Sequence, residues 1–466
     1  MKYLIGFLIS FLFTACAGAD AITPIAPSPT ETAKLATVSA TTVPTNLPAT
    51  ITSTPISLPA PTVTPSSTDV FVLQSDGDSY SPEISDNGRY IAFISRGKLT
   101  ENSIHGVEFL YVYDRETEQI ELASVALDGN SSEGRPFHIS LSSSGRYVGF
   151  HSHGGDLVVR DDELCDSGMS NCADLFIYDR QLKKMIRIPH GSPTGERWRY
   201  TPWMTFSPDE QYFFSNGVRD LEKGQYFDLN TGELLPKKPV IDYLLPDGTT
   251  AYFWNSKENN SEEDNLVEPI NASEILNLGD TSGGGVLVAF SSMPTDLTDN
   301  PISLCEDVTW NAEGLRPCFN IFIHSLETRE TWLATVGKDG WSSNGDTSWP
   351  MMSLNGRFLT FHTEATNLTD DDFSECISGG YRGLECFNVY LQDLQTGETI
   401  LISRELDSNL PAGYSRIGDI SGDGRFVTFY SESEKLVHHD TNEVSDVFVY
   451  DRLTEDITRI SVPNAP

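Results

Sequence analysis

The chain is poor in basic residues: 31 lysines and arginines stand against 67 aspartates and glutamates, and the formal net charge is −36 over 466 residues. Phosphate groups are bound by clustered lysine and arginine, so this shortage argues against nucleic acid and anionic membrane surfaces as partners. The acidity fits a well-solvated protein with a preference for cationic partners, and one specific acidic site is the narrower alternative.

Long hydrophobic runs are missing as well. The apolar run at residues 4–13 is too short to span a bilayer; it follows the positive charge of Lys2 and precedes small residues, as in an export signal. Residues 12–16 resemble the bacterial lipobox, which implies that the signal peptide, residues 1–15, is removed and that Cys16 becomes a lipid-bearing N-terminus. The alternative is an ordinary secretory signal in which Cys16 is incidental.

Charged and aromatic residues are almost absent from the segment that follows, residues 16–68, which is rich in Thr, Pro, Ser and Ala. Such a segment buries too little apolar surface to offset the entropy lost on ordering, and its prolines favour extended conformations. We predict a disordered stalk here, which lifts a folded domain at residues 69–466 away from the membrane. These N-terminal features predict a cell-envelope protein that is lipid-anchored outside the cytoplasmic membrane or extracellular.

From residue 69 the composition becomes globular, and a unit repeats along the chain, most clearly in its last copy, residues 421–462. Asp423-Gly424 is a tight-turn signal, because glycine adopts a positive φ without steric cost. Alternating bulky residues on either side of the turn predict short strands. Four antiparallel strands in about 45 residues are typical of one blade of a β-propeller. The predicted strands of this copy are residues 417–420, the stretch that begins at Phe426, residues 447–450 and residues 457–462.

The Gly-Arg-aromatic turn of this unit occurs four times, and three further copies have lost part of it. Five residues after the turn glycine, six of the seven copies have Phe, and the other has Ser215. A Phe at one fixed strand position predicts one shared packing site, the layer between neighbouring blades. The intact turns are Gly88-Arg89-Tyr90, Gly145-Arg146-Tyr147, Gly356-Arg357-Phe358 and Gly424-Arg425-Phe426, and the phenylalanines are Phe93, Phe150, Phe253, Phe290, Phe361 and Phe429.

Six copies have a recognisable third strand, and one, at about residues 240–272, lacks it. We therefore predict an all-β fold, a β-propeller of four-stranded antiparallel blades. Seven blades are expected, one of them eroded, and six blades with an insertion are the alternative.

The repeats resemble the WD40-like β-propeller repeat of the TolB type, whose blades carry a Ser-Pro-Asp-Gly-Arg-aromatic turn. Residues 207–209 match the opening of that turn, and residues 421–426 match its remainder. The last copy, through residues 435–452, also resembles an exported bacterial lipoprotein variant of the repeat. The resemblance covers residues 69–462 and implies the fold, but it says little about activity because propellers host many functions.

Cysteines are few, seven in all. Beyond Cys16 the other six form three local pairs, each between the second and third strands of its copy. An even number in an exported chain implies disulfides, and pairing within each loop follows because the loops of different blades lie too far apart. Zinc is the alternative, although the spacings are not Cys-x-x-Cys and no histidine accompanies each pair. The predicted disulfides are Cys165–Cys172, Cys305–Cys318 and Cys376–Cys386.

Motifs that would announce catalysis are missing. The chain has no Gly-x-Ser-x-Gly nucleophile elbow, no phosphate-binding glycine loop, no sialidase Asp box and no EF-hand spacing. Paired carboxylates for glycoside cleavage are an alternative in so acidic a chain, although no pair stands out. We therefore predict no catalytic residue and no cofactor-binding residue.

In a propeller, the loops between second and third strands share one face with the fourth-to-first connections, and here these loops are acidic. Most of their carboxylates are expected to be solvated turn residues, and a calcium site on this face is the alternative. The residues concerned are Asp156, Asp161, Asp162, Glu163, Asp166, Glu262, Glu263, Asp264, Asp296, Asp299, Asp370, Asp371, Asp372, Glu375, Asp440 and Glu443.

Two histidine clusters and five tryptophans complete the candidates. The clusters, at residues 151–153 and 438–440, lie in different copies and are expected to be surface-loop residues rather than zinc ligands. For each tryptophan we expect packing in a blade core. The alternative is a carbohydrate- or peptide-binding surface, with Trp341 and Trp349 in a fourth-to-first connection on the acidic face. The tryptophans are Trp198, Trp203, Trp310, Trp341 and Trp349.

These observations favour a monomeric, non-catalytic binding scaffold that is held in the cell envelope by its N-terminal lipid. Its acidic, disulfide-braced loops would meet a protein or glycan ligand. A propeller-type carbohydrate-active enzyme, either hydrolase or lyase, is the alternative. The TolB resemblance implies a third role, that of a periplasmic partner in an envelope complex.

Overall fold

In the computed structural model, every described residue belongs to the compact unit Asp69–Pro466. The predicted signal peptide, Cys16 and the predicted stalk lie outside the described residues. All elements in the described part of the chain are β-strands, and it contains no helix that could cross a membrane. The described residues are 74–159, 174–188, 204–215, 225–234, 240–244, 250–255, 267–269, 287–293, 297–306, 314–374, 387–408 and 410–464.

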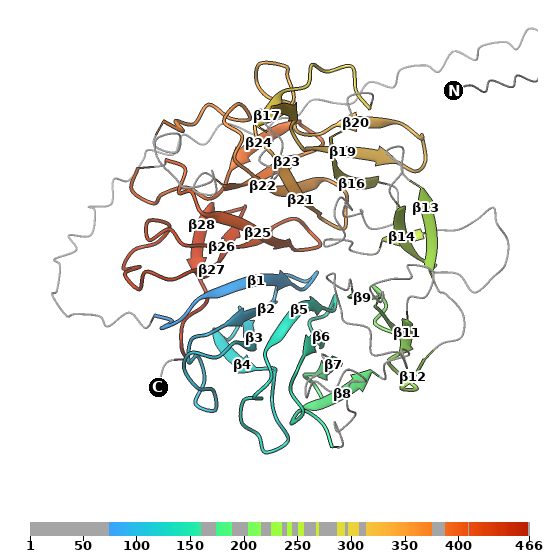
Figure 1. Ribbon diagram of the computed structural model, residues 1–466, viewed down its shortest axis with the longest axis vertical. Helices are drawn as coiled ribbons and strands as arrows, with labels where there is room; N and C mark the ends of the chain where they lie inside the picture. Colours follow the sequence, from blue (N-terminus) through green and yellow to red (C-terminus); the bar gives the residue numbers. More distant parts are fainter. Residues whose placement is uncertain are drawn as a thin grey trace, which may run out of the picture. The chain divides into compact units, whose positions relative to one another are not determined.

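The strands form small antiparallel sheets that follow one another around a ring (Figure 1). In the four-stranded sheets the first strand lies nearest the centre and the last lies outside. This is the predicted all-β propeller. The four-stranded sheets are β1 (Ser79–Ile84), β2 (Tyr90–Ser95), β3 (Phe109–Asp114) and β4 (Gln119–Leu122); β5 (Pro136–Leu141), β6 (Tyr147–Ser152), β7 (Asp174–Asp179) and β8 (Lys184–Ile188); β9 (Met204–Phe206), β10 (Tyr212–Ser215), β11 (Gln225–Asp228) and β12 (Glu233–Leu234); β21 (Thr347–Met352), β22 (Phe358–Thr363), β23 (Asn388–Asp393) and β24 (Glu398–Leu401); and β25 (Ser415–Ile420), β26 (Phe426–Ser431), β27 (Asp446–Asp451) and β28 (Asp456–Arg459).

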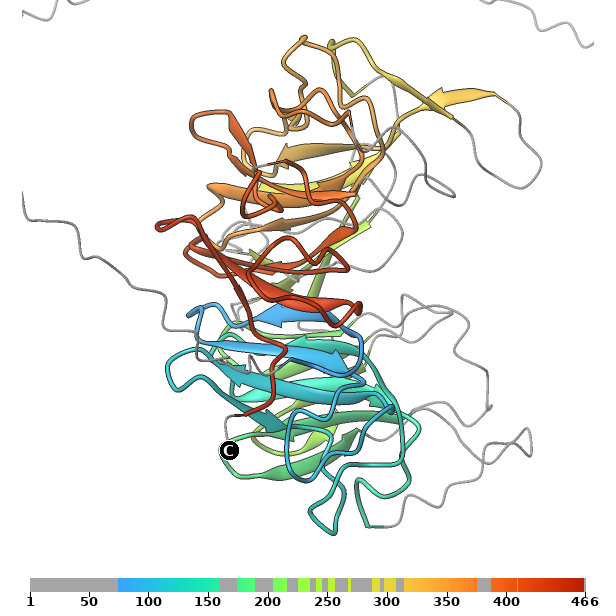
Figure 2. The same cartoon turned by 90° about the vertical axis from the view of Figure 1, so that its left-hand side faces the viewer.

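Shorter sheets complete the described part of the ring. One of them occupies the copy predicted to lack a third strand. That prediction is wrong, because β15 pairs with β14, and its three residues are too few for a periodic pattern to show. The number of blades stays a prediction. The shorter sheets are β13 (Val240–Leu244), β14 (Thr250–Asn255) and β15 (Val267–Pro269); β16 (Leu287–Ser292), β19 (Asn320–Ser325) and β20 (Thr331–Leu333); and the hairpin of β17 (Leu304–Glu306) and β18 (Leu315–Pro317), which projects at the edge of Figure 2 in yellow.

The last sheet has its four strands in the predicted order, β25-β26-β27-β28. Its first strand begins earlier than predicted, at Ser415, and its fourth strand ends at Arg459 rather than at residue 462. The fourth strand is shorter because the N–H of Val462 donates to the carbonyl of Ile460 (2.8 Å) within its own segment instead of continuing the ladder.

The Gly-Arg-aromatic turn brings each sheet against the one before it. Gly145 and Gly424 have φ of 75° and 72°, a region that residues with a side chain rarely adopt. A Cβ at these positions would overlap an aromatic ring of the preceding sheet, Tyr90 in the first case and Phe358 in the second. Glycine is therefore required for its backbone angle and also for this close approach.

Arginines hold the same aromatic rings from the other side. Arg146 of the turn donates to both carboxylate oxygens of Asp179, at 3.2 and 2.7 Å. The next residue, Arg180, lies over Tyr90 of the preceding sheet, with its Cζ 4.1 Å from the ring centroid, which is a cation–π contact. Equivalent ion pairs join Arg89 to Asp114, Arg357 to Asp393 and Arg425 to Asp451, and equivalent ring contacts join Arg115 to Phe426 and Arg452 to Phe358.

The shared packing site predicted from the repeated Phe is confirmed. Phe150 is fully buried, its ring centroid lies 5.8 Å from that of Phe176, and both rings belong to one cluster with Ala92 and Leu110 of the preceding sheet. Burying such a ring contributes roughly 1.5–3 kcal/mol. The side chain of Phe253 lies outside the described residues. The equivalent ring pairs are Phe93–Tyr111, Phe290–Phe322, Phe361–Tyr390 and Phe429–Phe448, with centroids 5.5 to 6.0 Å apart.

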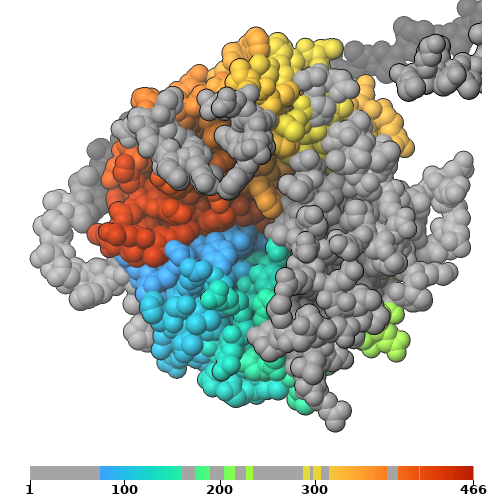
Figure 3. Space-filling model, viewed as in Figure 1, coloured from blue at the N-terminus to red at the C-terminus, as the bar shows by residue number. Residues whose placement is uncertain are grey.

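The first and last sheets close the ring against each other (Figure 3). Phe93 of the first sheet packs in one buried cluster with Val447 of the last. Beyond β28, the side chain of Asn464 accepts a hydrogen bond from the N–H of Ile120 (2.7 Å) and donates one to its carbonyl (2.8 Å). The C-terminal segment is thereby fastened to β4, the outer strand of the first sheet.

Candidate functional site

Antiparallel order sends the second-to-third loops and the fourth-to-first connections to one side of the ring, the loop face, and the Gly-Arg-aromatic turns to the other, the turn face. Both acidic loops and cysteine pairs were predicted for the loop face, so we treat it as the candidate site. Its described loops are residues 96–108, 153–159, 293, 297–306, 364–374 and 432–445, and its described connections are residues 123–135, 334–346, 402–408 and 410–414.

The three described connections are small hairpins that are bonded to the next loop. The N–H of Lys338, at one hairpin tip, donates to the carbonyl of Asn367 (2.8 Å), and Leu127 and Leu406 donate in the same way to the following loops. Backbone hydrogen bonds therefore join connections and loops into one rim. The bridges that close the hairpins are Val125–Ser131, Val336–Ser342 and Arg404–Pro411.

A buried leucine anchors each of four described loops beneath this rim. Leu99, Leu157, Leu368 and Leu436 are at most 3% exposed, and each packs in the core cluster of its own sheet. Sequence reasoning missed these anchors. The signal was present, because three of them stand seven residues after the repeated Phe. The loops are thus held from below by apolar packing and from above by hydrogen bonds.

Most described acidic residues of these loops are engaged by the protein itself. Asp371 pairs with Arg404 through both carboxylate oxygens, and Asp370 pairs with Lys338. Asp156 accepts hydrogen bonds from the hydroxyl of Ser132 and from a backbone N–H. These carboxylates hold connections and loops together. Outside the described residues lie Asp161, Asp162, Glu163, Asp166, Glu262, Glu263, Asp264, Asp296 and Glu375.

The expected solvated role holds for one carboxylate and fails for another. Asp372 is an exposed turn residue that accepts the N–H of Ser374 (2.9 Å), a bond that lowers the pKa of Asp372. Asp440 is buried instead, beside Arg459. The described residues contain one group with the spacing of a metal site, Cys305, Cys318 and Asp346, and its sulfurs form a disulfide. A calcium site on this face stays a prediction.

The disulfide Cys305–Cys318 is present and braces an inserted hairpin. Cys305 lies in β17 and Cys318 just before β19, so the bond ties the hairpin to the sheet that carries it. Sulfurs joined in a disulfide offer no thiolate to zinc, the alternative considered for this pair. The hairpin is also held by Arg316, which donates to both carboxylate oxygens of Asp346 at 2.8 and 2.5 Å. Cys165, Cys172, Cys376 and Cys386 lie outside the described residues.

The histidines behave differently from the prediction. His151 is not a surface-loop residue, because it lies within β6 and is fully buried, with Phe137 stacked on its ring (centroids 5.5 Å apart). His153 follows the strand and stacks on the same Phe137. The other cluster, at residues 438–440, lies in the loop before β27. Sequence reasoning missed His362, which is buried between two sheets. Burial lowers the pKa of His362 to about 3, so the imidazole stays neutral.

Two of the described tryptophans are exposed, one on the loop face and one on the first strand of a sheet. Trp341 is 49% exposed on a connection hairpin, and Trp349 is 42% exposed. The expectation of core packing is therefore wrong for both. Trp349 also lies in β21, rather than in the connection, beside a β-bulge and with φ of 57°. Such a backbone angle is rare for a bulky residue, and its use here points the indole away from the sheet core. Trp198, Trp203 and Trp310 lie outside the described residues.

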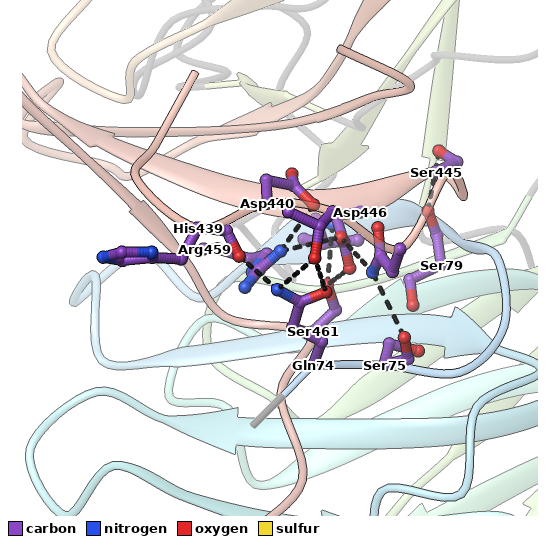
Figure 4. Close-up of polar contacts among 12 residues, drawn as sticks. Gln74, Ser75, Ser79, His439, Asp440, Ser445, Asp446, Arg459 and Ser461 are labelled. Carbon is purple, nitrogen blue, oxygen red and sulfur yellow. Dashed lines mark hydrogen bonds and ion pairs between the residues drawn. The ribbon is translucent and has the colours of Figure 1, made fainter. Parts of the chain in front are cut away.

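A buried charge cluster fixes the last loop, residues 432–445 (Figure 4). The guanidinium of Arg459 lies 2.7 Å from a carboxylate oxygen of Asp440 and 3.3 Å from one of Asp446. Ser461 donates its hydroxyl to Asp446 (2.5 Å). Two carboxylates share one guanidinium, so negative charge is in excess. Burial, together with the neighbouring Asp446 carboxylate, raises the pKa of Asp440 to about 6.

This cluster is structural, because it joins the start of the described chain to the last sheet. Asn442 donates to the carbonyl of Ser75 (3.1 Å) and also to Asp446 (2.8 Å). The second sheet has an ion pair at the same register, Arg187 with Asp174 at 3.0 Å. A pair that recurs between sheets serves the fold rather than a ligand.

Neither a protein-family model nor a curated protein matches the chain. Solved structures of similar fold include the β-propeller domain of the Trilobed protease from Pyrococcus furiosus, at 9% identity and a TM-score of 0.45 over 85% of this chain and 98% of that chain. TolB from Acinetobacter baumannii is similar at 13% identity and a TM-score of 0.33, over 69% of this chain and 53% of that chain. Oligogalacturonate lyase from Vibrio parahaemolyticus is similar at 12% identity and a TM-score of 0.40, over 82% of this chain and 92% of that chain.

These likenesses concern the fold alone, since every identity is 13% or less. Propellers host many functions, so the fold does not separate an enzyme from a binding protein. The geometry of the loop face has to supply the functional argument.

Proposed function

We propose that the protein is a non-catalytic binding scaffold that presents its loop face to a protein or glycan ligand. The observation that carries this proposal is a contrast between two kinds of side chain. Most described carboxylates of the loops are engaged by other groups of the protein, as Asp371 and Asp440 are, whereas Trp341 and Trp349 remain exposed.

Exposed aromatic rings on a fixed backbone are typical anchors of binding surfaces, because they offer much contact area and lose little entropy on binding. Trp341 stands on a hairpin whose tip is bonded to the next loop, and Trp349 stands on a strand. General acid–base catalysis would instead need carboxylates that are free to exchange protons with a substrate. The engaged carboxylates of this face are poorly suited to that role.

The proposal includes the lipid anchor at Cys16 and the stalk at residues 16–68. Together they would hold a monomeric propeller at the outer side of the cytoplasmic membrane or outside the cell. A ligand would then be captured at the envelope.

The test uses the full-length protein in detergent, applied to glycan and peptide arrays with and without calcium. We expect saturable binding to one of the two arrays, and recovery of the bound molecules chemically unchanged after prolonged incubation. Shortened glycans, or glycans with new unsaturated ends, would instead show a hydrolase or lyase. Failure to bind either array would contradict the scaffold.

A further inference from the structure

Exposed apolar side chains gather at one place on the loop face, around the disulfide-braced hairpin. Met293, Leu304, Leu315 and Trp341 are between 39% and 66% exposed, and we call them the apolar patch. Exposed apolar residues scattered singly need no explanation, but a contiguous group of them marks an interaction surface.

Contacts between the segments show that the residues of the patch stand on neighbouring parts of the structure. Ser303, next to Leu304, donates its N–H to the hydroxyl of Ser342, next to Trp341 (2.9 Å). Arg316, next to Leu315, lies 4.0 Å from the sulfur of Met293. The hairpin, the connection that carries Trp341 and the end of β16 are therefore neighbours in space.

The hairpin turns one face inward and the other outward. Cys305 is opposite Arg316 in the ladder, and both point to the protein, one into the disulfide and the other to Asp346. Because side chains alternate along a strand, Leu304 and Leu315 share the outer face. The disulfide and the bidentate ion pair thus fix two leucines in a solvent-facing position that adds nothing to the core.

The charges around the patch are negative. Its two cations, Arg316 and Lys338, are already paired with Asp346 and Asp370. Asp339 and Glu364 have no ion-pair partner among the described side chains. Burial raises the pKa of Glu364, and the neighbouring Asp346 carboxylate adds to this effect.

We infer that the apolar patch is a docking site for a protein segment that combines apolar side chains with lysine or arginine. Leucines and tryptophan offer the apolar contact, and the surrounding surplus of carboxylates selects a cationic partner. This inference rests on the proposed binding function and narrows it to a peptide-like ligand at one place on the loop face. A glycan has no cationic groups to use the carboxylates unless it carries amines, so the charge favours a protein.

The experiment measures binding of the full-length protein to three sets of short synthetic peptides by fluorescence anisotropy. One set combines Leu and Phe with Lys and Arg, the second replaces the basic residues by Glu, and the third replaces the apolar residues by Ser. The protein variants are Leu304→Ser/Leu315→Ser and Trp341→Ala. The matched control is Leu182→Ser/Leu453→Ser, which removes two leucines that are 64% and 63% exposed on third-to-fourth turns, on the turn face.

We expect the protein to bind the first set of peptides alone, and salt to weaken this binding. The affinity should fall by roughly tenfold or more in both patch variants but not in the control. Unchanged melting temperatures would confirm that the variants are folded. Equal binding of acidic and basic peptides, or equal losses in patch and control variants, would overturn the docking site. Binding to a glycan array without peptide binding would overturn it and leave the scaffold standing, whereas no binding to either probe would reject both.

Discussion

At the scale of single residues, the repeated turn assigns separate tasks to neighbours in sequence. The glycine supplies a positive φ and leaves room for a ring of the preceding sheet, and the arginine binds the aspartate at the end of its own third strand. The sequence pattern predicted the turn itself. It did not predict the contact across the sheet boundary, because the ring that meets Gly424 belongs to Phe358, far away along the chain.

The two constraints on this glycine can be separated by substitution. Gly424→Ala should lower the free energy of unfolding by about 3 kcal/mol, from the strain of a positive φ and from overlap with the ring of Phe358. Gly340→Ala is the control, because Gly340 has φ of 83° but no atom lies within 4 Å of an added Cβ. A loss of about 1–2 kcal/mol in the free energy of unfolding is expected from its backbone angle alone. Urea unfolding of both variants would measure the difference. Equal losses would show that the ring contact is unimportant.

At the scale of elements, the β17–β18 hairpin was only half predicted. The cysteine pair showed that the long loop is closed on itself, but its two strands have three residues each and carry no periodic signal. The buried leucines under the loops were missed because a single apolar residue in a polar stretch has no period of its own. Their signal is found only by comparing the repeats with one another. The strands of the blades, in contrast, combine a turn motif with alternation, and they were predictable to within a few residues.

Removing the disulfide should loosen this hairpin and leave the blades intact. In Cys305→Ser/Cys318→Ser, the chain-entropy account applied to local opening of the hairpin predicts that this opening becomes easier by about 2–3 kcal/mol for a loop of this length. We expect faster hydrogen exchange at β17 and β18, with unchanged exchange at β25 to β28. Because Arg316 still binds Asp346, the hairpin should remain attached. Faster exchange throughout the protein would contradict this local role.

At the scale of the whole molecule, the boundary between the first and last sheets contains buried acids. Asp440 belongs to the charge cluster of the last loop, and Asp419 on β25 accepts the N–H of Ile84 across the boundary (3.1 Å). Burial raises the pKa of Asp419 to about 7 and that of Asp440 to about 6. Sequence reasoning assigned Asp440 to solvent, because nothing local shows which loop meets the start of the propeller.

These acids make the closure pH-dependent. Both pKa values lie above the ordinary 3.8, so between about pH 4 and 7 the folded protein holds protons that the unfolded chain has lost. Stability should therefore fall as the pH rises through this window. We expect the melting temperature of Asp419→Asn/Asp440→Asn to fall less than that of the wild type between pH 5 and pH 8.

A carboxylate of the opposite kind provides the control for this experiment. Asp451 is bound by Arg425, which lowers its pKa, so its stabilising effect is lost as the pH falls below the ordinary range. Asp451→Asn should therefore lower the free energy of unfolding more at pH 7 than at pH 3. If the wild type and the double variant show the same pH profile, the two buried acids do not govern the closure.

The first and last sheets each carry both halves of a joint. The first sheet, for example, offers the ring of Tyr90 to Arg180 of its successor and places Arg115 over Phe426 of its predecessor. A duplicated blade would arrive with both halves in place and could be inserted without altering either neighbour. A blade that lost one half would weaken a boundary it shares with another. Growth of such a ring by tandem duplication is thus compatible with the joint, whereas exchange of unlike blades would have to preserve it.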